Sequence, residues 1–119
     1  MKERATLICR REDQILYVRK AKSRWNLPGG KVEKNETPAA AAARELDEET
    51  GLQVLELIFI GAYESEDTLH HLFEARIADS AKPTPQNEIA ECRWQTRQQL
   101  SELRVNANAR AIVKTLRAA

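Results

Sequence analysis

Hydrophobic positions along the chain follow two periodicities, one of two residues and one near 3.6 residues. Strand-like stretches, rich in aliphatic residues and bounded by polar turns, cover residues 4–10, 15–20, 52–63, 68–77 and 89–95. Helical spacing covers residues 38–50 and resumes at Thr96, with a break predicted near Asn106. This order of strands, helix, strands and helix predicts an α/β fold in which a mixed sheet is flanked by helices.

The helix over residues 38–50 has the clearest predicted boundaries. Thr37 is a good N-cap residue, and Pro38 suits the first helical position, where its missing N–H is not needed. Gly51 suits the left-handed position just beyond the end of a helix. We therefore expect the helix to begin at Pro38 and to end at about Thr50.

Composition and charge narrow the class of protein. The chain has 119 residues, 42% of them hydrophobic and 31% charged, which predicts one globular domain over residues 1–119. A formal net charge of +1 gives no general attraction to nucleic acid or to acidic membranes. The N-terminus is too polar for a signal peptide and no apolar run is long enough for a membrane helix, so we expect a cytoplasmic protein. Cys9 and Cys92 are expected to be free thiols.

Acidic residues gather on one face of the helix over residues 38–50. At about 100° per residue, an arc of about 140° contains Arg44, Glu45, Glu48 and Glu49. The opposite, apolar face contains Ala39, Ala42, Ala43 and Leu46. Carboxylates four residues apart repel each other, and the helix dipole opposes them near a C-terminus. A solvated charged face is the simplest explanation, but a bound Mg²⁺ would turn both penalties into attraction.

The spacing of residues around this helix carries the functional prediction. Glu36 follows Gly30 after five residues, and seven residues later the sequence reads RELDEETGL, from Arg44 to Leu52. This pattern resembles the Nudix box, the signature of the Nudix hydrolase family and its small MutT-like members, and it covers residues 30–52. The resemblance implies a Nudix-type α/β/α sandwich. Asn35 stands where the family often has glycine, and asparagine tolerates the left-handed backbone almost as well.

The resemblance also implies roles for individual residues. Ligands of Mg²⁺, or of Mn²⁺ as a substitute, would be Glu45, Glu48 and Glu49, with the Gly29 carbonyl within reach of a metal. Glu36 would be a supporting ligand or the partner that fixes Arg44, and Arg44 would hold the glutamates in place. A further glutamate often stands six residues before a tryptophan, as Glu88 stands before Trp94. Glu45, Glu88 and Glu91 remain candidates for the catalytic base that activates water.

The residues that would bind the substrate are predicted less sharply. Arg19 and Lys20 end a strand near the glycine turn and either hold a phosphate or form a solvated strand end. Trp25 either stacks on a base or packs beneath its loop. Asn108, near the start of the last helix, either reads a base, as an asparagine does in the MutT-like branch, or is an ordinary polar residue at a helix start.

These observations predict metal-dependent hydrolysis of a diphosphate linkage in a nucleoside triphosphate or another nucleoside diphosphate derivative. The alternatives are a catalytically silent Nudix fold that senses a nucleotide, and a structural domain with an acidic surface helix. An intact box disfavours the first alternative, and the spacing of residues 30–52 is unexplained by the second. The expected partner is a small nucleotide, with no membrane and no stable nucleic-acid partner. Homodimers are common among small family members, but the sequence does not decide this point.

Overall fold

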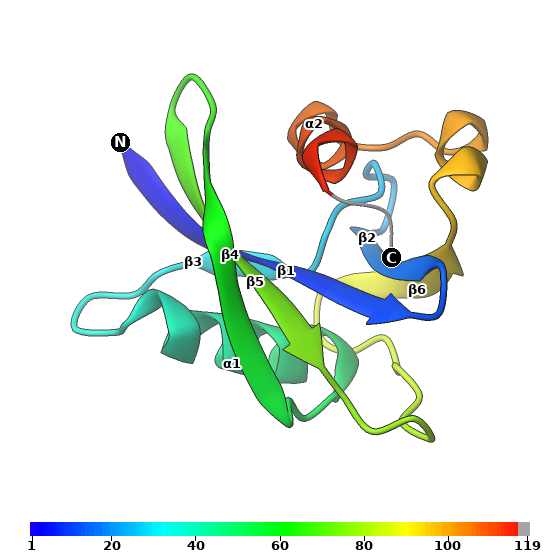
Figure 1. The fold of residues 1–119 in the computed structure, drawn as a ribbon, viewed down its shortest axis with the longest axis horizontal. Coiled ribbons are helices and arrows are strands. Elements are labelled where there is room, and N and C mark those ends of the chain that lie inside the picture. The colour runs from blue at the N-terminus through cyan, green and yellow to red at the C-terminus, as the bar shows by residue number, and fades with distance from the viewer. Residues whose placement is uncertain (117–119) are drawn as a thin grey trace.

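The computed structural model describes residues 1–116 of the chain. One sheet contains six strands, β1 (Lys2–Arg11), β2 (Gln14–Lys20), β3 (Gly29–Lys31), β4 (Glu56–Glu64), β5 (Thr68–Arg76) and β6 (Ile89–Gln95). The helices are α1 (Pro38–Thr50), the short 3₁₀ helix η1 (Gln98–Glu102) and α2 (Ala107–Thr115). Figure 1 shows α1 on one side of the twisted sheet, and α2 and η1 on the other.

The sheet is mixed, as predicted, and it divides at β1. The strand order is β4-β5-β1-β2-β6, with β3 paired to β1 as well. β1 runs parallel to β5, while the pairs β1–β2, β1–β3, β2–β6 and β4–β5 are antiparallel. β1 pairs with β2 only beside the hairpin turn, whereas its residues 4–6 pair with β3. β1 and β2 therefore separate as they leave their turn, and a cavity opens between them.

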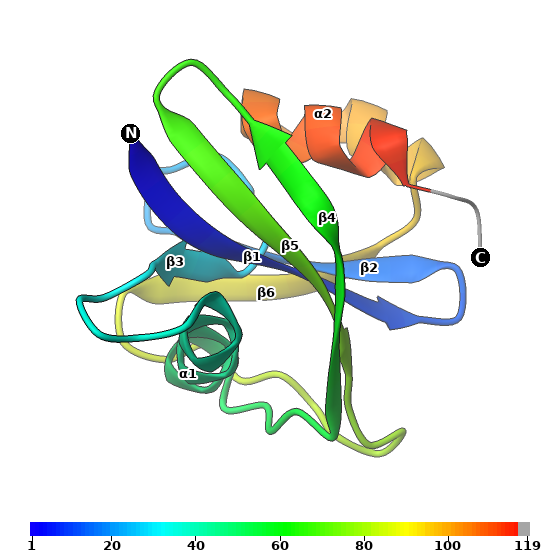
Figure 2. The ribbon, with the colours of Figure 1, turned by 60° about the vertical axis from the view of Figure 1, so that its left-hand side comes forward.

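Alternating residues of β1 separate two hydrophobic clusters, one on each face of the sheet. Leu7 belongs to the cluster beneath α1, together with Ala42 and Leu46. Ile8 belongs to the cluster beneath α2, together with Ile112. All five side chains are fully buried. This arrangement, visible in Figure 2, confirms the predicted sandwich of a mixed sheet between helices.

The capping signals place α1 where the sequence predicts it. The Thr37 side chain accepts a hydrogen bond from the Ala40 N–H at 3.1 Å, and Pro38 occupies the first turn. Gly51 ends the helix in the left-handed conformation, with φ of 74°, and its N–H donates to the Asp47 carbonyl. The α1 helix that carries the acidic residues is therefore fixed at both ends by local chemistry.

Replacing Thr37 with alanine should lower the free energy of unfolding by about 1 kcal/mol, because the Ala40 N–H loses its only side-chain acceptor at the helix start. The carboxylates of α1 lie at least two turns further along, so turnover per folded molecule should not change. Urea unfolding combined with an activity assay checks both expectations. An unchanged midpoint would show that water replaces the cap without loss.

Two elements differ from the prediction, and a third agrees with it. The strand predicted over 52–63 begins at Glu56, because Leu52 packs into the core beneath α1 as the chain leaves Gly51. The three-residue β3 lies between the strand predicted over 15–20 and the helix predicted over 38–50, and its pairing with β1 has no local sequence signal. The helical segment predicted from Thr96 is η1 followed by α2, and the predicted break is confirmed because Asn106 is the N-cap of α2.

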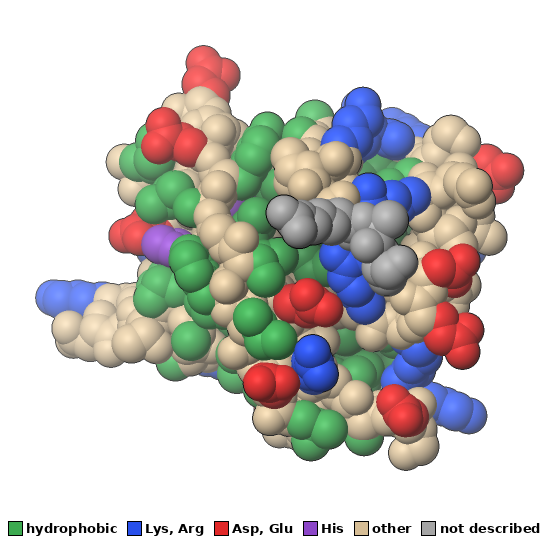
Figure 3. Space-filling model, viewed as in Figure 1, with side chains coloured by type: hydrophobic (Ala, Val, Ile, Leu, Met, Phe, Trp, Pro, Cys, Tyr) green, Lys and Arg blue, Asp and Glu red, His purple; other side chains and the backbone are tan. Residues whose placement is uncertain are grey.

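The exposed hydrophobic residues, the two cysteines and the lengths of the helices can be compared with the sequence-based expectations. Hydrophobic side chains gather over β4 at one edge of the sheet, including the exposed Phe59 and Ile60 (Figure 3). Cys9 and Cys92 are free thiols, as predicted, and burial raises the pKa of each to about 11. Within residues 1–116, no helix is both long and apolar enough to cross a membrane.

Candidate active site

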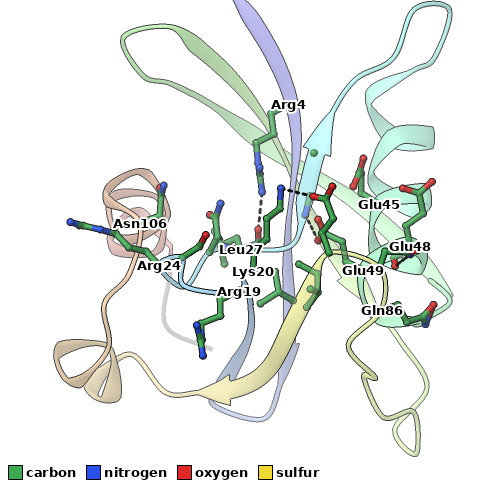
Figure 4. Close-up of a pocket in the computed structure, with 18 of the residues that line it drawn as sticks. Arg4, Arg19, Lys20, Arg24, Leu27, Glu45, Glu48, Glu49, Gln86 and Asn106 are labelled. Carbon is green, nitrogen blue, oxygen red and sulfur yellow. Dashed lines mark hydrogen bonds and ion pairs between the residues drawn. The ribbon is translucent and has the colours of Figure 1, made fainter.

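A cavity of about 850 Å³ lies between the separating strands β1 and β2. Helix α1 forms one wall, and the loop that precedes α2 lies on the opposite side (Figure 4). The acidic residues of the lining are Glu45, Glu48, Glu49 and Glu88. The basic residues of the lining are Arg4, Arg19, Lys20, Lys22, Arg24, Lys31 and Arg104. This combination suits a ligand that carries both metal-bound and metal-free phosphate oxygens.

The buried face of α1 is rotated relative to the prediction. The buried residues are Ala41, Ala42, Leu46 and Thr50, whereas Ala39 is exposed and Ala43 is only half-buried. At about 100° per residue, the buried arc then includes the directions of Glu45 and Glu49. These two carboxylates are therefore drawn beneath the edge of the sheet, while Glu48 stays exposed.

Glu49 is the carboxyl group of the cavity whose pKa is raised. It is half-buried, and its Oε1 accepts a hydrogen bond from the Gly29 N–H at 3.1 Å. Burial raises the pKa of Glu49 to about 7, and the charge of Glu45 acts in the same direction, against the Gly29 hydrogen bond. A carboxylate held in such surroundings destabilises the metal-free protein, and a bound cation would reverse that effect.

Two glycines allow the backbone to approach these carboxylates. A Cβ on Gly30 would lie 2.5 Å from the Glu45 Cδ, so the carboxylate occupies the space that any other residue would fill. A Cβ on Gly29 would lie 2.1 Å from the Ala5 carbonyl oxygen, and its φ of 143° is a conformation that side chains rarely adopt. β3 therefore requires glycine at both positions. Gly30 leaves room for the Glu45 carboxylate, and Gly29 allows the close pairing with β1.

Arg44 organises the outer side of the acidic face. Its Nε and Nη2 donate to the two oxygens of Glu36 at 2.7 and 2.9 Å. Its Nη1 donates to Glu45 at 2.9 Å and to Glu48 at 3.3 Å, and Nη2 also donates to the Lys31 carbonyl. The Arg44 hydrogen bonds lower the pKa of Glu36 to about 2. Of the two roles considered for Glu36, this geometry favours the partner of Arg44, and Glu36 does not line the cavity.

Replacing Arg44 with lysine should lower turnover by about 100-fold while the fold is retained. A lysine keeps the charge but cannot donate simultaneously to Glu36, Glu45 and the Lys31 carbonyl, so the carboxylates of α1 lose their fixed positions. Steady-state kinetics together with circular dichroism check this. Wild-type turnover in the lysine variant would show that charge alone is sufficient here.

The donor set suits a hard divalent cation, and it is incomplete without a ligand. Across residues 1–116, no group of three acidic, histidine or cysteine side chains converges closely enough to hold a metal by itself. The three glutamates of α1 nevertheless supply carboxylate oxygens to one cavity wall, beside the backbone of Gly29 and Gly30. Magnesium characteristically takes few protein carboxylates and completes its shell with water and substrate phosphate, so these residues fit such an ion.

The two candidate bases at the start of β6, Glu88 just before the strand and Glu91 within it, occupy different surroundings. Glu88 lines the cavity, is well exposed, and pairs with Lys20 at 2.9 Å between Nζ and Oε2. Glu91 forms an ion pair with Arg19 and does not line the cavity. The loop that carries Glu88 is fixed to the end of α1, because the Asn87 Nδ2 donates to the Glu48 carbonyl at 2.6 Å.

The predicted substrate-binding residues are only partly brought together. Arg19 and Lys20 both line the cavity, although each is paired with a glutamate. Trp25 is 6% exposed, packs in the core beneath α2, and does not line the cavity. Asn108 also lies outside the lining, where its neighbour Asn106 takes its place. The distinction between Asn106 and Asn108 depends on where α2 begins, which the sequence predicted only approximately.

Sequence reasoning missed several cavity residues. Arg4 belongs to an ordinary strand pattern, and only the pairing of β1 with β3 brings its side chain into the cavity. Arg24 and Arg104 are far apart in the sequence, but an isolated bridge between Trp25 and Val105 places them together. The polar segment that carries Arg24 hinted that it was available to a ligand, whereas Arg104 falls within the segment predicted to be helical from Thr96.

Comparison with known proteins agrees with this geometry. The NUDIX domain family matches residues 1–116. A CMP-5'-(N-acetyl-N-hydroxy-3-aminopropyl)phosphonate hydrolase of Streptomyces rubellomurinus is 38% identical over 84 residues, 66% of this chain and 41% of that protein. An RNA pyrophosphohydrolase of Bartonella henselae is 39% identical over 77 residues, 65% of this chain and 39% of that protein. This chain thus spans about two fifths of the length of these relatives.

Solved structures share the fold over nearly the whole chain. A Nudix hydrolase family member from Chromobacterium violaceum has a TM-score of 0.86 at 29% identity and covers 96% of this chain and 74% of its own. A MutT Nudix hydrolase from Burkholderia pseudomallei has a TM-score of 0.85 at 20% identity and covers 98% of both chains. With the family match, the box at residues 30–52 and the cavity beside it, this chain belongs to the Nudix hydrolase family.

Proposed function

We propose that this protein hydrolyses a diphosphate linkage in a nucleoside triphosphate or another nucleoside diphosphate derivative. The observation that carries the proposal is the wall of α1, where the half-buried Glu49 and Glu45 face a cavity that also contains Arg4 and Lys20. Three carboxylates for cations and several cationic side chains for phosphate match a polyphosphate bound through metal. The relatives named above include a pyrophosphohydrolase and a hydrolase of a CMP derivative, which supports this reaction class.

Nudix hydrolases generally use divalent metal ions, and Mg²⁺, with Mn²⁺ as a substitute, is the cofactor proposed here. Glu45, Glu48 and Glu49 would hold it, with the Gly29 carbonyl as a further donor. When bound, the ion would neutralise substrate charge and lower the pKa of a water molecule. Arg44 keeps the carboxylates in position through the contacts described above.

Glu88 is the base that the geometry favours. It lines the cavity and is well exposed, whereas Arg44 engages Glu45, and Glu91 lies outside the lining in its ion pair with Arg19. The Glu88 carboxylate would take a proton from the attacking water as the water oxygen bonds to phosphorus. The bridging P–O bond then breaks, and the leaving phosphate departs with the electron pair. Lys20, paired with Glu88, lies close enough to the same centre to contact a phosphate oxygen.

A cavity of about 850 Å³ is in the size range of sites that enclose a nucleotide-sized ligand. This supports a small nucleotide partner, while the absence of a stable nucleic-acid partner and of membrane binding remains a prediction. A catalytically silent nucleotide sensor is the second candidate function, but every glutamate of the box is present and positioned along the cavity or by Arg44. One domain over residues 1–119, of which 117–119 lie outside the described residues, a cytoplasmic location and a homodimer remain predictions.

A panel of nucleoside triphosphates, nucleoside diphosphate sugars and dinucleoside polyphosphates tests the proposal. We expect turnover of at least one class with Mg²⁺, none with a chelator, and a loss of about 100-fold or more in the Glu48→Gln variant. Gln keeps the size of the exposed Glu48 side chain, so the variant should fold normally. Binding of a nucleotide without turnover would favour the sensor, and metal-independent turnover would contradict the proposal.

A further inference from the structure

Arg4 is a charged residue of the cavity that lies outside the Nudix box, and the box assigns it no role. It projects from β1 into the cavity and is half-buried (Figure 4). Burial lowers the pKa of its guanidinium, although the nearby charges of Glu49 and Glu45 act in the opposite direction. No ion pair within 4.0 Å joins Arg4 to a carboxylate in residues 1–116. A partly buried cation without a contacting counter-ion is unfavourable unless an anion completes its surroundings.

The protein fixes the orientation of this guanidinium from two sides. Its Nη2 donates to the Leu27 carbonyl at 2.8 Å, and its Nε donates to the Thr6 Oγ1 at 3.1 Å. No hydrogen bond within the described part of the chain engages Nη1. A guanidinium held by two of its nitrogens presents the third as a fixed donor, which is the geometry that phosphate recognition uses.

A buried hydrogen-bond chain lies behind the Arg4 contact. Thr6 is 1% exposed, and its Oγ1 lies 2.9 Å from the Nδ1 of His70, which is 6% exposed. Since arginine can only donate, Thr6 accepts from Arg4, and the Thr6 hydroxyl also forms a hydrogen bond with His70 Nδ1. Burial lowers the pKa of His70, and the positive charge of Arg4 acts in the same direction. The contact with the buried imidazole therefore holds the Thr6 hydroxyl in place behind Arg4.

We propose that Arg4 is a substrate-binding residue whose Nη1 donates to a non-bridging oxygen of the substrate diphosphate, and that Thr6 and His70 position it. This inference rests on the proposed function, because it names the group that recognises the phosphate outside the carboxylate wall of α1. Arg4 contacts the ground state and the transition state alike. Its removal therefore raises KM and weakens phosphate affinity more than it lowers kcat.

The probe is methylenediphosphonate, a non-hydrolysable analogue of the diphosphate group, added with Mg²⁺ to the wild-type protein. Nuclear magnetic resonance of the arginine Nε–Hε groups reports Arg4 directly, because its Nε–H is held by Thr6. We expect the Arg4 signal to shift with the probe while that of Arg76, at the far end of β5, stays unchanged. An unshifted Arg4 signal with the probe bound would overturn the inference.

Variants extend the test to affinity and kinetics. Arg4→Lys should weaken binding of the probe and raise KM by about 10- to 100-fold, with kcat lowered less than about threefold. Thr6→Val, which keeps the shape of a buried side chain, should weaken binding about fivefold through lost orientation. Arg76→Lys is the matched control and should change neither quantity.

Failure of the inference and failure of the proposed function give different results. If Glu48→Gln abolishes turnover while Arg4→Lys binds the probe and the substrate as the wild type does, the function stands and the role of Arg4 falls. If no compound is hydrolysed but the probe still shifts Arg4, the site binds phosphate and the hydrolase proposal falls. Loss of kcat without a change in KM or in probe affinity would also contradict the binding role.

Discussion

Replacing Glu49 with glutamine is expected to abolish Mg²⁺-dependent turnover and, in the absence of metal, to stabilise the protein. Glutamine retains the oxygen that accepts the Gly29 hydrogen bond, so the contact with β3 is preserved. The substitution removes a negative charge that burial and the neighbouring Glu45 both disfavour. Stability and function should therefore move in opposite directions at this one position.

The stability of the metal-free protein should also change with pH in a defined direction. The pKa of Glu49 is raised from 4.5 to about 7 in the folded protein, so between these values the folded state binds more protons than the unfolded state. Stability of the metal-free wild type should fall as the pH rises from about 4.5 to 7. The full loss is on the order of 2 kcal/mol, after allowance for partial exposure. Glu49→Gln should lack this decline.

Urea unfolding with a chelator, from pH 4.5 to 8, measures the effect. The Glu49→Gln variant should exceed the wild type by about 1–2 kcal/mol at pH 8 and match it near pH 4.5. Mg²⁺ should stabilise the wild type and leave the variant unchanged. Glu66→Gln, on the exposed turn between β4 and β5, is the control and should do neither. A variant less stable than the wild type at pH 8 would show that the Glu49 charge is already compensated in the metal-free protein.

Alanine substitutions at the adjacent residues Gly29 and Gly30 are expected to have large but different effects. Gly29→Ala places a methyl group 2.1 Å from the Ala5 carbonyl oxygen at a φ of 143°, and neither backbone can yield without breaking the pairing of β3 with β1. The free energy of unfolding should drop by about 3 kcal/mol or more. Gly30→Ala meets only the flexible carboxyl group of Glu45 at 2.5 Å. The fold should therefore survive while the Glu45 carboxylate is displaced.

Thermal unfolding and turnover together distinguish the two glycines. Gly29→Ala should lower the melting temperature strongly, whereas Gly30→Ala should change it little and reduce turnover by about 100-fold. If Gly30→Ala turned over at the wild-type rate, the observed position of Glu45 would not be the catalytic one. If Gly29→Ala melted with the wild type, the strand pairing at Ala5 would be looser than the structure shows.

Local chemistry explains which parts of the fold were predictable. Thr37, Pro38 and Gly51 determine the ends of α1 through backbone conformation and hydrogen bonds within a few residues, so the sequence was sufficient. β3 has only three residues, two of them glycine, and exists because β1 offers it hydrogen-bonding partners. No short window of sequence contains that information.

The residues of the active site likewise divide into those that local sequence predicts and those that it does not. The glutamates of the box were predictable because fixed spacing on one helix places them together. The rotation of α1 that half-buries Glu49 could not be predicted, because the alanines at several positions made more than one apolar face of the helix possible. Arg4 and Asn106 join the cavity only through strand pairing and the start of α2, so their positions depend on contacts distant in the sequence. Trp25 is the opposite case, a residue that the sequence offers for base stacking but that packs in the core instead.

The most direct test of the central claim is hydrolysis in ¹⁸O-labelled water, followed by ³¹P nuclear magnetic resonance, with the best compound of the panel. We expect one ¹⁸O atom bonded to phosphorus per turnover, dependence on Mg²⁺, and loss of label incorporation in Glu48→Gln. This result would place the attack of water at phosphorus, with α1 as its catalytic wall. Label in the Glu48→Gln reaction at the wild-type rate, or turnover without label on phosphorus, would contradict the account.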